Sequence, residues 1–309
     1  MDCWHYIVNS LKASKAVYLL YVVHSEGSSP GRTAFKMAVA DDGTFNGTIG
    51  GGVMEFKLVE KARKLLEEKT YTPFLQEQYH DKVHPKNQSG MICSGSQTIA
   101  FVPLLTKDIA LIETIIATDN NAAITITAQG IALTQIAKQE LVYHSETDWC
   151  YTGLIKDLPV IHIVGGGHCG LALSQLMKQL GFYIHLYDDR ENLNTIDDNN
   201  FADEIQIVDY PLIGETIAAN PTDFVVIMTI GYRTDKIVLT QLIQKTFRYL
   251  GLLGSVQKIA TLFEELKAEG IPDALLSAVH APIGLNINSK TTQEIAVSIA
   301  AEVIKIKNG

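Results

Sequence analysis

Hydrophobic and polar positions follow two different periods along the chain. Continuous apolar runs over residues 16–24 and 160–164 are typical of buried strands, while apolar residues recur at helical spacing from Leu58 to Leu66 with charged residues between them. In the first half the pattern predicts helices over 2–13, over 107–117 and directly after residue 52. It predicts strands over 16–24, 35–40, 71–79, 98–104, 122–127 and 141–143, with a hairpin turn at 41–43.

Strands and helices alternate regularly in the second half. Strands are expected over 160–164, 182–187, 204–208, 223–229 and 249–253, and helices from 170 to 180 and over 235–246, 256–269 and 294–304. Such alternation predicts a parallel sheet with helices on both faces. The fold class is therefore α/β, with a C-terminal Rossmann-like domain over 157–309 and an N-terminal mixed-sheet α/β domain over 1–156. Residues 145–157 are the best linker candidate.

Composition narrows the class of protein. The 309 residues are 47% hydrophobic and 19% charged, with a formal charge of −9, which indicates a folded globular chain and argues against non-specific nucleic-acid binding. The first residues lack the pattern of a signal peptide, and no apolar run is long enough to span a bilayer. The four cysteines are scattered, without a C-x-x-C pair. We expect a cytoplasmic protein with free thiols and no membrane or nucleic-acid partner.

A glycine motif lies between the first strand and helix of the second half. Gly165, Gly167 and Gly170 satisfy G-x-G-x-x-G, and Asp188 follows eighteen residues later, where a βαβ unit presents a ribose-binding acid. Gly165 permits the tight turn, Gly167 lets the backbone approach a pyrophosphate, and Gly170 allows close helix packing. His168 lies at the expected phosphate position, where it either pairs with the phosphate or is merely solvated. We predict a nucleotide site here.

A second glycine cluster, Gly50, Gly51 and Gly52, precedes the predicted helix of the first half. Consecutive glycine amides before a helix can form a nest for phosphate or carboxylate, and Glu55 could accept a hydrogen bond from a ligand. The competing interpretation is an ordinary helix start, with Glu55 as a first-turn carboxylate.

Cys93 is the sharpest chemical candidate. It lies in a loop-like Met-Ile-Cys-Ser-Gly context, where backbone amides can lower the pKa of a thiol and make it a nucleophile or a soft-metal ligand. The alternative is a small buried hydrophobe. His80 and His84 have the i, i+4 spacing of zinc ligands on a helix, but Pro85 argues against a helix through them. No third residue stands at the spacing that a zinc-binding motif requires.

The chain resembles the xanthine dehydrogenase accessory-factor family, the XdhC/CoxI-like proteins, through nearly its whole length. The matching segments are residues 27–30 with Met37, 47–55, 91–95, 165–170, 188–190, 249–255 and 281–285 with 294–299. The chain departs from the family pattern at Ile230, where relatives often have histidine, and at Val256, where arginine is common.

The resemblance implies an accessory protein, more a cofactor chaperone than an enzyme. Such a protein would bind the molybdenum cofactor, a molybdopterin in plain or dinucleotide form, assist its sulfuration with a cysteine desulfurase, and pass it to a molybdenum hydroxylase such as xanthine dehydrogenase. Cys93 matches the cysteine implicated in holding the cofactor, as a molybdenum thiolate ligand. The two glycine regions would share its pterin and phosphate ends, or the second would take a separate nucleotide. A homo-oligomer is compatible with this role.

Two other functions stay open. One is an NAD(P)-dependent oxidoreductase that uses the Rossmann-like domain; Asp188 favours NAD, while Arg190 keeps NADP open. The other is a thiol-dependent enzyme centred on Cys93, for which the sequence offers no positioned base.

Overall fold

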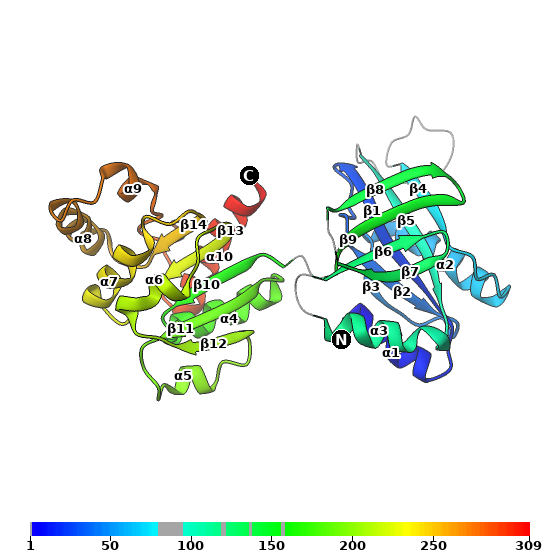
Figure 1. Ribbon diagram of the computed structural model, residues 1–309, viewed down its shortest axis with the longest axis horizontal. Coiled ribbons are helices and arrows are strands. Elements are labelled where there is room, and N and C mark those ends of the chain that lie inside the picture. Colours follow the sequence, from blue (N-terminus) through cyan, green and yellow to red (C-terminus); the bar gives the residue numbers. More distant parts are fainter. Residues whose placement is uncertain (1, 80–94, 119–121, 136–137, 156–157) are drawn as a thin grey trace. The chain divides into compact units, whose positions relative to one another are not determined.

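A computed structural model describes residues 2–79, 95–118, 122–135, 138–155 and 158–309. The chain divides into two compact units, Met1–Asp157 and Leu158–Gly309. Figure 1 shows the elements of each unit, which are considered separately below.

The N-terminal unit is built on a five-stranded antiparallel sheet in the order β3-β2-β1-β5-β4. Its central strand β1 is buried without a break from Val17 to Val23, which explains the continuous apolar run, since both faces are covered. The strands are β1 (Val17–Gly27), β2 (Lys36–Ala40), β3 (Phe45–Thr48), β4 (Phe74–Tyr79) and β5 (Gly95–Leu104). The predicted hairpin at 41–43 joins β2 to β3 and is confirmed.

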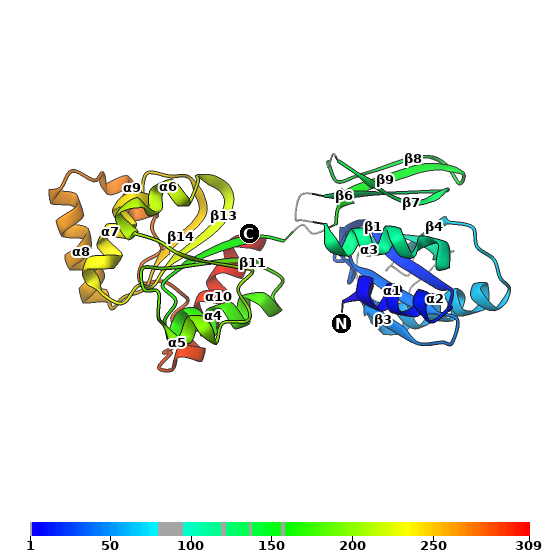
Figure 2. The same ribbon diagram turned by 60° about the horizontal axis from the view of Figure 1, so that its bottom comes forward.

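The two faces of this sheet are covered differently. On one face the apolar stripe of α2 (Gly52–Glu67), including Met54 and Leu58, packs against β1, β2 and β5. The other face packs against α1 (Cys3–Lys12), α3 (Ile109–Ala117) and a second sheet. Figure 2 shows this second sheet lying over the first. A short 3-10 turn, Thr106–Asp108, precedes α3 where the sequence predicted a continuous helix from 107.

The second sheet corrects the predicted linker. Its four antiparallel strands run in the order β7-β6-β9-β8, namely β6 (Ala123–Thr127), β7 (Gly130–Thr134), β8 (Glu140–Ser145) and β9 (Asp148–Leu154). β9 occupies most of the segment 145–157 and lies between β6 and β8. Trp149 and Tyr151 are buried at alternate positions, which is the period of a half-buried strand. The interpretation as a linker was therefore wrong for residues 148–154, while the boundary between the two units falls at the end of the predicted segment, after Asp157. β7 was missed.

The C-terminal unit contains a five-stranded parallel sheet in the order β12-β11-β10-β13-β14. The strands are β10 (Val160–Val164), β11 (Tyr183–Asp188), β12 (Glu204–Ile207), β13 (Asn220–Ile227) and β14 (Phe247–Leu252). Numbered within the unit, this order is 3-2-1-4-5, the arrangement of the Rossmann fold, whose strand order reverses between the first and fourth strands. The predicted α/β class with a C-terminal parallel sheet is confirmed.

Helices cover both faces of the parallel sheet, as predicted. α4 (His168–Gln179) and α10 (Thr292–Asn308) pack on one face, and α6 (Ile213–Thr216), α7 (Tyr232–Leu242) and α8 (Val256–Ala268) on the other. Short helices α5 (Asn194–Asp197), α9 (Asp273–Ala278) and the 3-10 turn Tyr210–Leu212 were not predicted, because segments this short carry too few apolar positions to show a period. Among the described residues no helix combines the length and hydropathy needed to cross a membrane.

Candidate functional site

The glycine turn of the C-terminal unit lies where the strand order reverses, at the carboxyl ends of β10 and β13. Gly165 has a φ of 122°, and a Cβ there would lie 2.2 Å from the carbonyl oxygen of Met228. A Cβ on Gly170 would lie 2.1 Å from the Gly165 oxygen, whereas one on Gly167 would meet no atom within 4 Å. Gly165 and Gly170 are thus required by the packing of the chain, and Gly167 leaves an open backbone surface. Ligand binding there stays a prediction.

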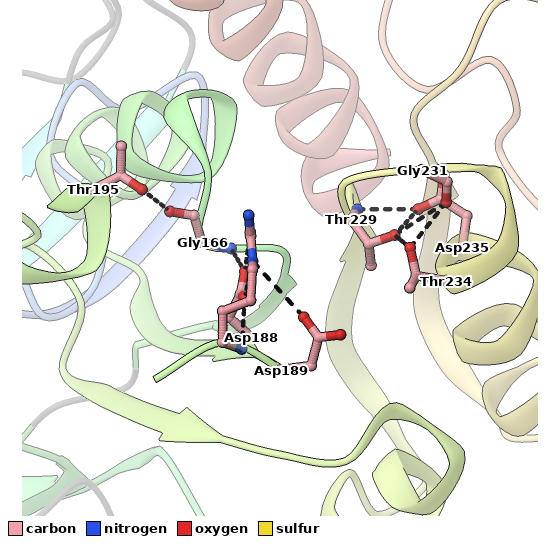
Figure 3. Close-up of polar contacts among 9 residues, drawn as sticks. Gly166, Asp188, Asp189, Thr195, Thr229, Gly231, Thr234 and Asp235 are labelled. Carbon is pink, nitrogen blue, oxygen red and sulfur yellow. Dashed lines mark hydrogen bonds and ion pairs between the residues drawn. The ribbon is translucent and has the colours of Figure 1, made fainter. Parts of the chain in front are cut away.

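Asp188, the last residue of β11, holds the glycine turn in place. Its Oδ2 accepts a hydrogen bond from the Gly166 amide at 2.7 Å, while Thr195 Oγ1 donates to the Gly166 carbonyl at 2.5 Å. Arg190 donates to Asp188 through its amide, Nε and Nη2, at 3.1, 2.7 and 2.8 Å. Figure 3 shows how the peptide at Gly166 is fixed between Asp188 and Thr195.

These contacts set the charge state of Asp188. Burial alone would raise the pKa of this carboxyl, but the hydrogen bonds from Arg190 and the Gly166 amide outweigh burial and leave the pKa lowered. The neighbouring Asp189 differs: burial and the Asp188 charge raise its pKa, and its side chain is 36% exposed, against 0% for Asp188. The acid that the sequence assigned to a ribose is thus a fully buried part of the loop.

A second network fixes the loop after β13, on the other side of the reversal point. The buried Asp235 accepts hydrogen bonds through Oδ1 from the amide of Thr229, at 3.0 Å, and from its hydroxyl, at 2.6 Å. Its Oδ2 pairs with Lys258 Nζ, which also donates to the Leu253 carbonyl at 3.2 Å. Thr234 bonds to Thr229 and to the Gly231 carbonyl (Figure 3). Asp235 therefore ties the loops after β13 and β14 together.

Two residues of the first turn of α4 have different surroundings. His168 is exposed at the first position of the helix, next to the open face of Gly167. Cys169 is half-buried, packs against the core on the α4 face, and has its thiol pKa raised by burial. The role of His168 at a bound phosphate stays a prediction.

In the N-terminal unit, Gln97 connects three separate segments. This residue of β5 is 1% exposed. Its Oε1 accepts hydrogen bonds from Ser29 Oγ at 2.8 Å and from the Gly31 amide at 3.1 Å. Its Nε2 donates to the Ile49 carbonyl and lies 3.2 Å from the sulfur of Met54. The segments 27–31 and 47–52 thus meet at the start of β5. Sequence reasoning missed Gln97, because the residue lies among Ser96 and Thr98 and just before the strand predicted over 98–104.

The glycines of this second cluster have distinct environments. A Cβ on Gly50, whose φ is 125°, would lie 2.6 Å from the Gly31 nitrogen, whereas Gly51 faces open space at a φ of 73°. Gly52 is exposed and begins α2. Glu55 Oε2 accepts three hydrogen bonds from the chain itself: from Thr48 Oγ1 at 2.7 Å and from the Ile49 and Gly51 amides at 2.9 and 3.0 Å. Glu55 therefore orders the loop, and Gly51 offers its open backbone.

Cys93, His80 and His84 lie outside the described residues. Within the described ranges, no group of three or more histidine, cysteine, aspartate or glutamate side chains is arranged to hold a metal ion. A cavity of about 920 Å³ lies between β4 and the second sheet, with Lys61, Phe74 and Tyr143 in its wall. None of the described candidate residues lines it, so the glycine loops remain the candidate sites.

The fold and these loops define a class of protein: a Rossmann-type unit joined to a mixed α/β unit, each with its own glycine loop. The comparisons agree unit by unit. Residues 161–303 match the XdhC Rossmann domain, and residues 10–79 match the XdhC and CoxI family. Together the two matches cover more than half of the chain. The chain therefore belongs to the XdhC and CoxI family, as the resemblance predicted.

Several individual proteins are also similar to the chain. The uncharacterized protein YqeB of Escherichia coli is 27% identical over 93% of this chain and 43% of its own length. A probable xanthine dehydrogenase subunit of Bacillus subtilis is 27% identical over 56% of this chain and 50% of its own length. The chain thus spans about half the length of these relatives. A crystal structure described as a xanthine dehydrogenase from Bacillus halodurans shares the fold, with a TM-score of 0.69 at 24% identity, covering all of this chain and 96% of that one.

Proposed function

We propose that this protein is an accessory factor for the maturation of a molybdenum hydroxylase such as xanthine dehydrogenase. Family membership over both units carries the proposal. In this role the protein binds the molybdenum cofactor, protects it while a cysteine desulfurase installs its sulfur, and delivers it to the client enzyme. It acts as a chaperone for the cofactor, without turnover of its own.

In this proposal the N-terminal loops bind part of that cofactor. The Gly51 amide donates to Glu55, but a Cβ on Gly51 would meet no atom within 4 Å, and Gly52 begins a sixteen-residue helix whose first amides favour an anionic or polar group. Gln97 keeps this loop against the start of β5. Cys93, two residues before β5 in the sequence, supplies the thiolate ligand to the molybdenum in this proposal.

The test is cofactor retention and client activation. We expect wild-type protein purified from a molybdate-fed host to carry bound pterin and molybdenum, and to raise the activity of a co-expressed xanthine dehydrogenase. Cys93→Ser should lose most of the bound cofactor while its circular dichroism spectrum stays unchanged. Cys150→Ser is the matched control, because this half-buried cysteine belongs to β9. Equal retention by both variants would contradict the role of Cys93.

The strand order of the C-terminal unit supports a second candidate, an NAD(P)-dependent oxidoreductase. The 3-2-1-4-5 order with a glycine turn at the reversal point is the arrangement that binds dinucleotides. Calorimetry with NAD and NADP, followed by absorbance at 340 nm with candidate substrates, tests this function. Turnover of a reduced nicotinamide without any effect on a molybdenum enzyme would favour it over the accessory role.

A further inference from the structure

The acid at the position that the motif indicates, Asp188, is enclosed by the chain, whereas the next residue, Asp189, is partly exposed. Asp188 stands at the end of β11, where the Rossmann pattern places an acid against the ribose hydroxyls. A carboxylate offers about four lone-pair positions. All four are used by the chain, through the Gly166 amide and three donors of Arg190. The Asp188 side chain is 0% exposed, so a ribose could reach it only if Arg190 or the glycine turn moved away.

Asp189 has the properties that Asp188 lacks. It is the first residue after β11, its side chain is 36% exposed, and Figure 3 shows it on the side of Asp188 that faces the Thr229 loop. Its Oδ1 lies 3.8 Å from Arg190 Nε, which is beyond hydrogen-bond distance, so this guanidinium contact leaves the oxygens able to accept. Asp188 in turn holds Arg190 through Nε and Nη2, which fixes the guanidinium beside Asp189.

The local charge favours a neutral partner over an anionic one. Asp188 and Asp189 are two carboxylates beside one guanidinium, which leaves an excess of one negative charge at the end of β11 when both are ionised. A phosphate on the ribose would bring further negative charge to this point, whereas a free diol brings two hydroxyl donors.

We propose that Asp189, positioned by the Asp188–Arg190 pair, accepts hydrogen bonds from the ribose diol of a nucleoside diphosphate bound at the glycine turn. The proposal rests on the proposed function and extends it by naming the class of ligand that the glycine turn of the C-terminal unit binds. The ligand class is a ribonucleotide with an unphosphorylated diol. It includes both an adenine dinucleotide and the cytosine dinucleotide form of the pterin cofactor.

Binding of defined probes tests the assignment. Isothermal titration of the purified full chain would compare ADP with 2′-deoxy-ADP, CDP with 2′-deoxy-CDP, and AMP with adenosine 2′,5′-bisphosphate. A hydrogen bond to a charged acceptor corresponds to roughly a ten- to hundred-fold preference for the ribose form. Asp189→Ala should reduce that preference to about one, because the acceptor is gone. Asp197→Ala is the control, since it removes one exposed carboxylate from the neighbouring α5 with the same change in net charge.

The outcomes separate the alternatives. A preference for the ribose form that disappears only in Asp189→Ala supports the proposal. Tighter binding of ADP would indicate an adenine nucleotide as the ligand, and tighter binding of CDP a cytosine nucleotide. A preference that survives in Asp189→Ala, or tighter binding of adenosine 2′,5′-bisphosphate than of AMP, would overturn it. If none of these nucleotides binds, the nucleotide assignment fails, and client activation still reports separately on the accessory role.

Discussion

Gln97 offers the most direct test of how the N-terminal loops are held. Gln97→Leu keeps the approximate volume of the side chain but removes its amide. The Gly31 amide and the Ile49 carbonyl each lose the partner that Gln97 supplies. A buried polar group left without a partner costs about 1–3 kcal/mol. Partial rehydration at the exposed edge of the loops reduces the summed cost of these lost hydrogen bonds. We therefore expect the free energy of unfolding to fall by about 2–5 kcal/mol.

The position of the tryptophans makes this measurement specific. Both tryptophans of the chain, Trp4 and Trp149, are buried in the N-terminal unit, so their fluorescence in a urea titration reports that unit alone. Gln129→Leu is the matched control, because Gln129 is exposed in the turn between β6 and β7, and it should change stability by less than about 0.5 kcal/mol. An equally small change for Gln97→Leu would refute the view that this amide joins the loops.

Two further predictions concern the stability of the C-terminal unit. Its unfolding is measured by circular dichroism, as the part of the transition that has no counterpart in the tryptophan fluorescence. Gly170→Ala should destabilise this unit by about 1–3 kcal/mol, because its Cβ would meet the backbone of Gly165. Gly231→Ala is the control, because a Cβ at Gly231 would meet no atom within 4 Å. Equal stabilities of the two variants would contradict the close-packing argument. Because Arg190 and the Gly166 amide lower the pKa of Asp188 in the folded state, its stabilising contribution is present at neutral pH and is lost as the pH falls below the ordinary aspartate value of about 4. Asp188→Asn should therefore flatten the acid side of the stability profile, and an unchanged acid slope would count against this assignment.

The sequence by itself determined the parts of the molecule that periodicity and spacing encode. The alternation after residue 159 predicted the parallel sheet with helices on both faces, and the glycine spacing placed the turn between β10 and α4. The burial of β1 on both faces could be read from its unbroken apolar run. These features are local, so each short window of sequence carries enough information to specify them.

Only the tertiary structure decided which residues meet. Gln97, Ser29 and Ile49 are far apart in sequence, and only the pairing of β1 with β5 brings them together. β9 was taken for a linker because its buried face is visible only once β6 and β8 flank it. Spacing alone could not distinguish Asp188 from Asp189, since consecutive residues at a strand end point in different directions. Burial separated them: the first carboxylate is enclosed by Arg190 and the glycine turn, and the second is partly exposed.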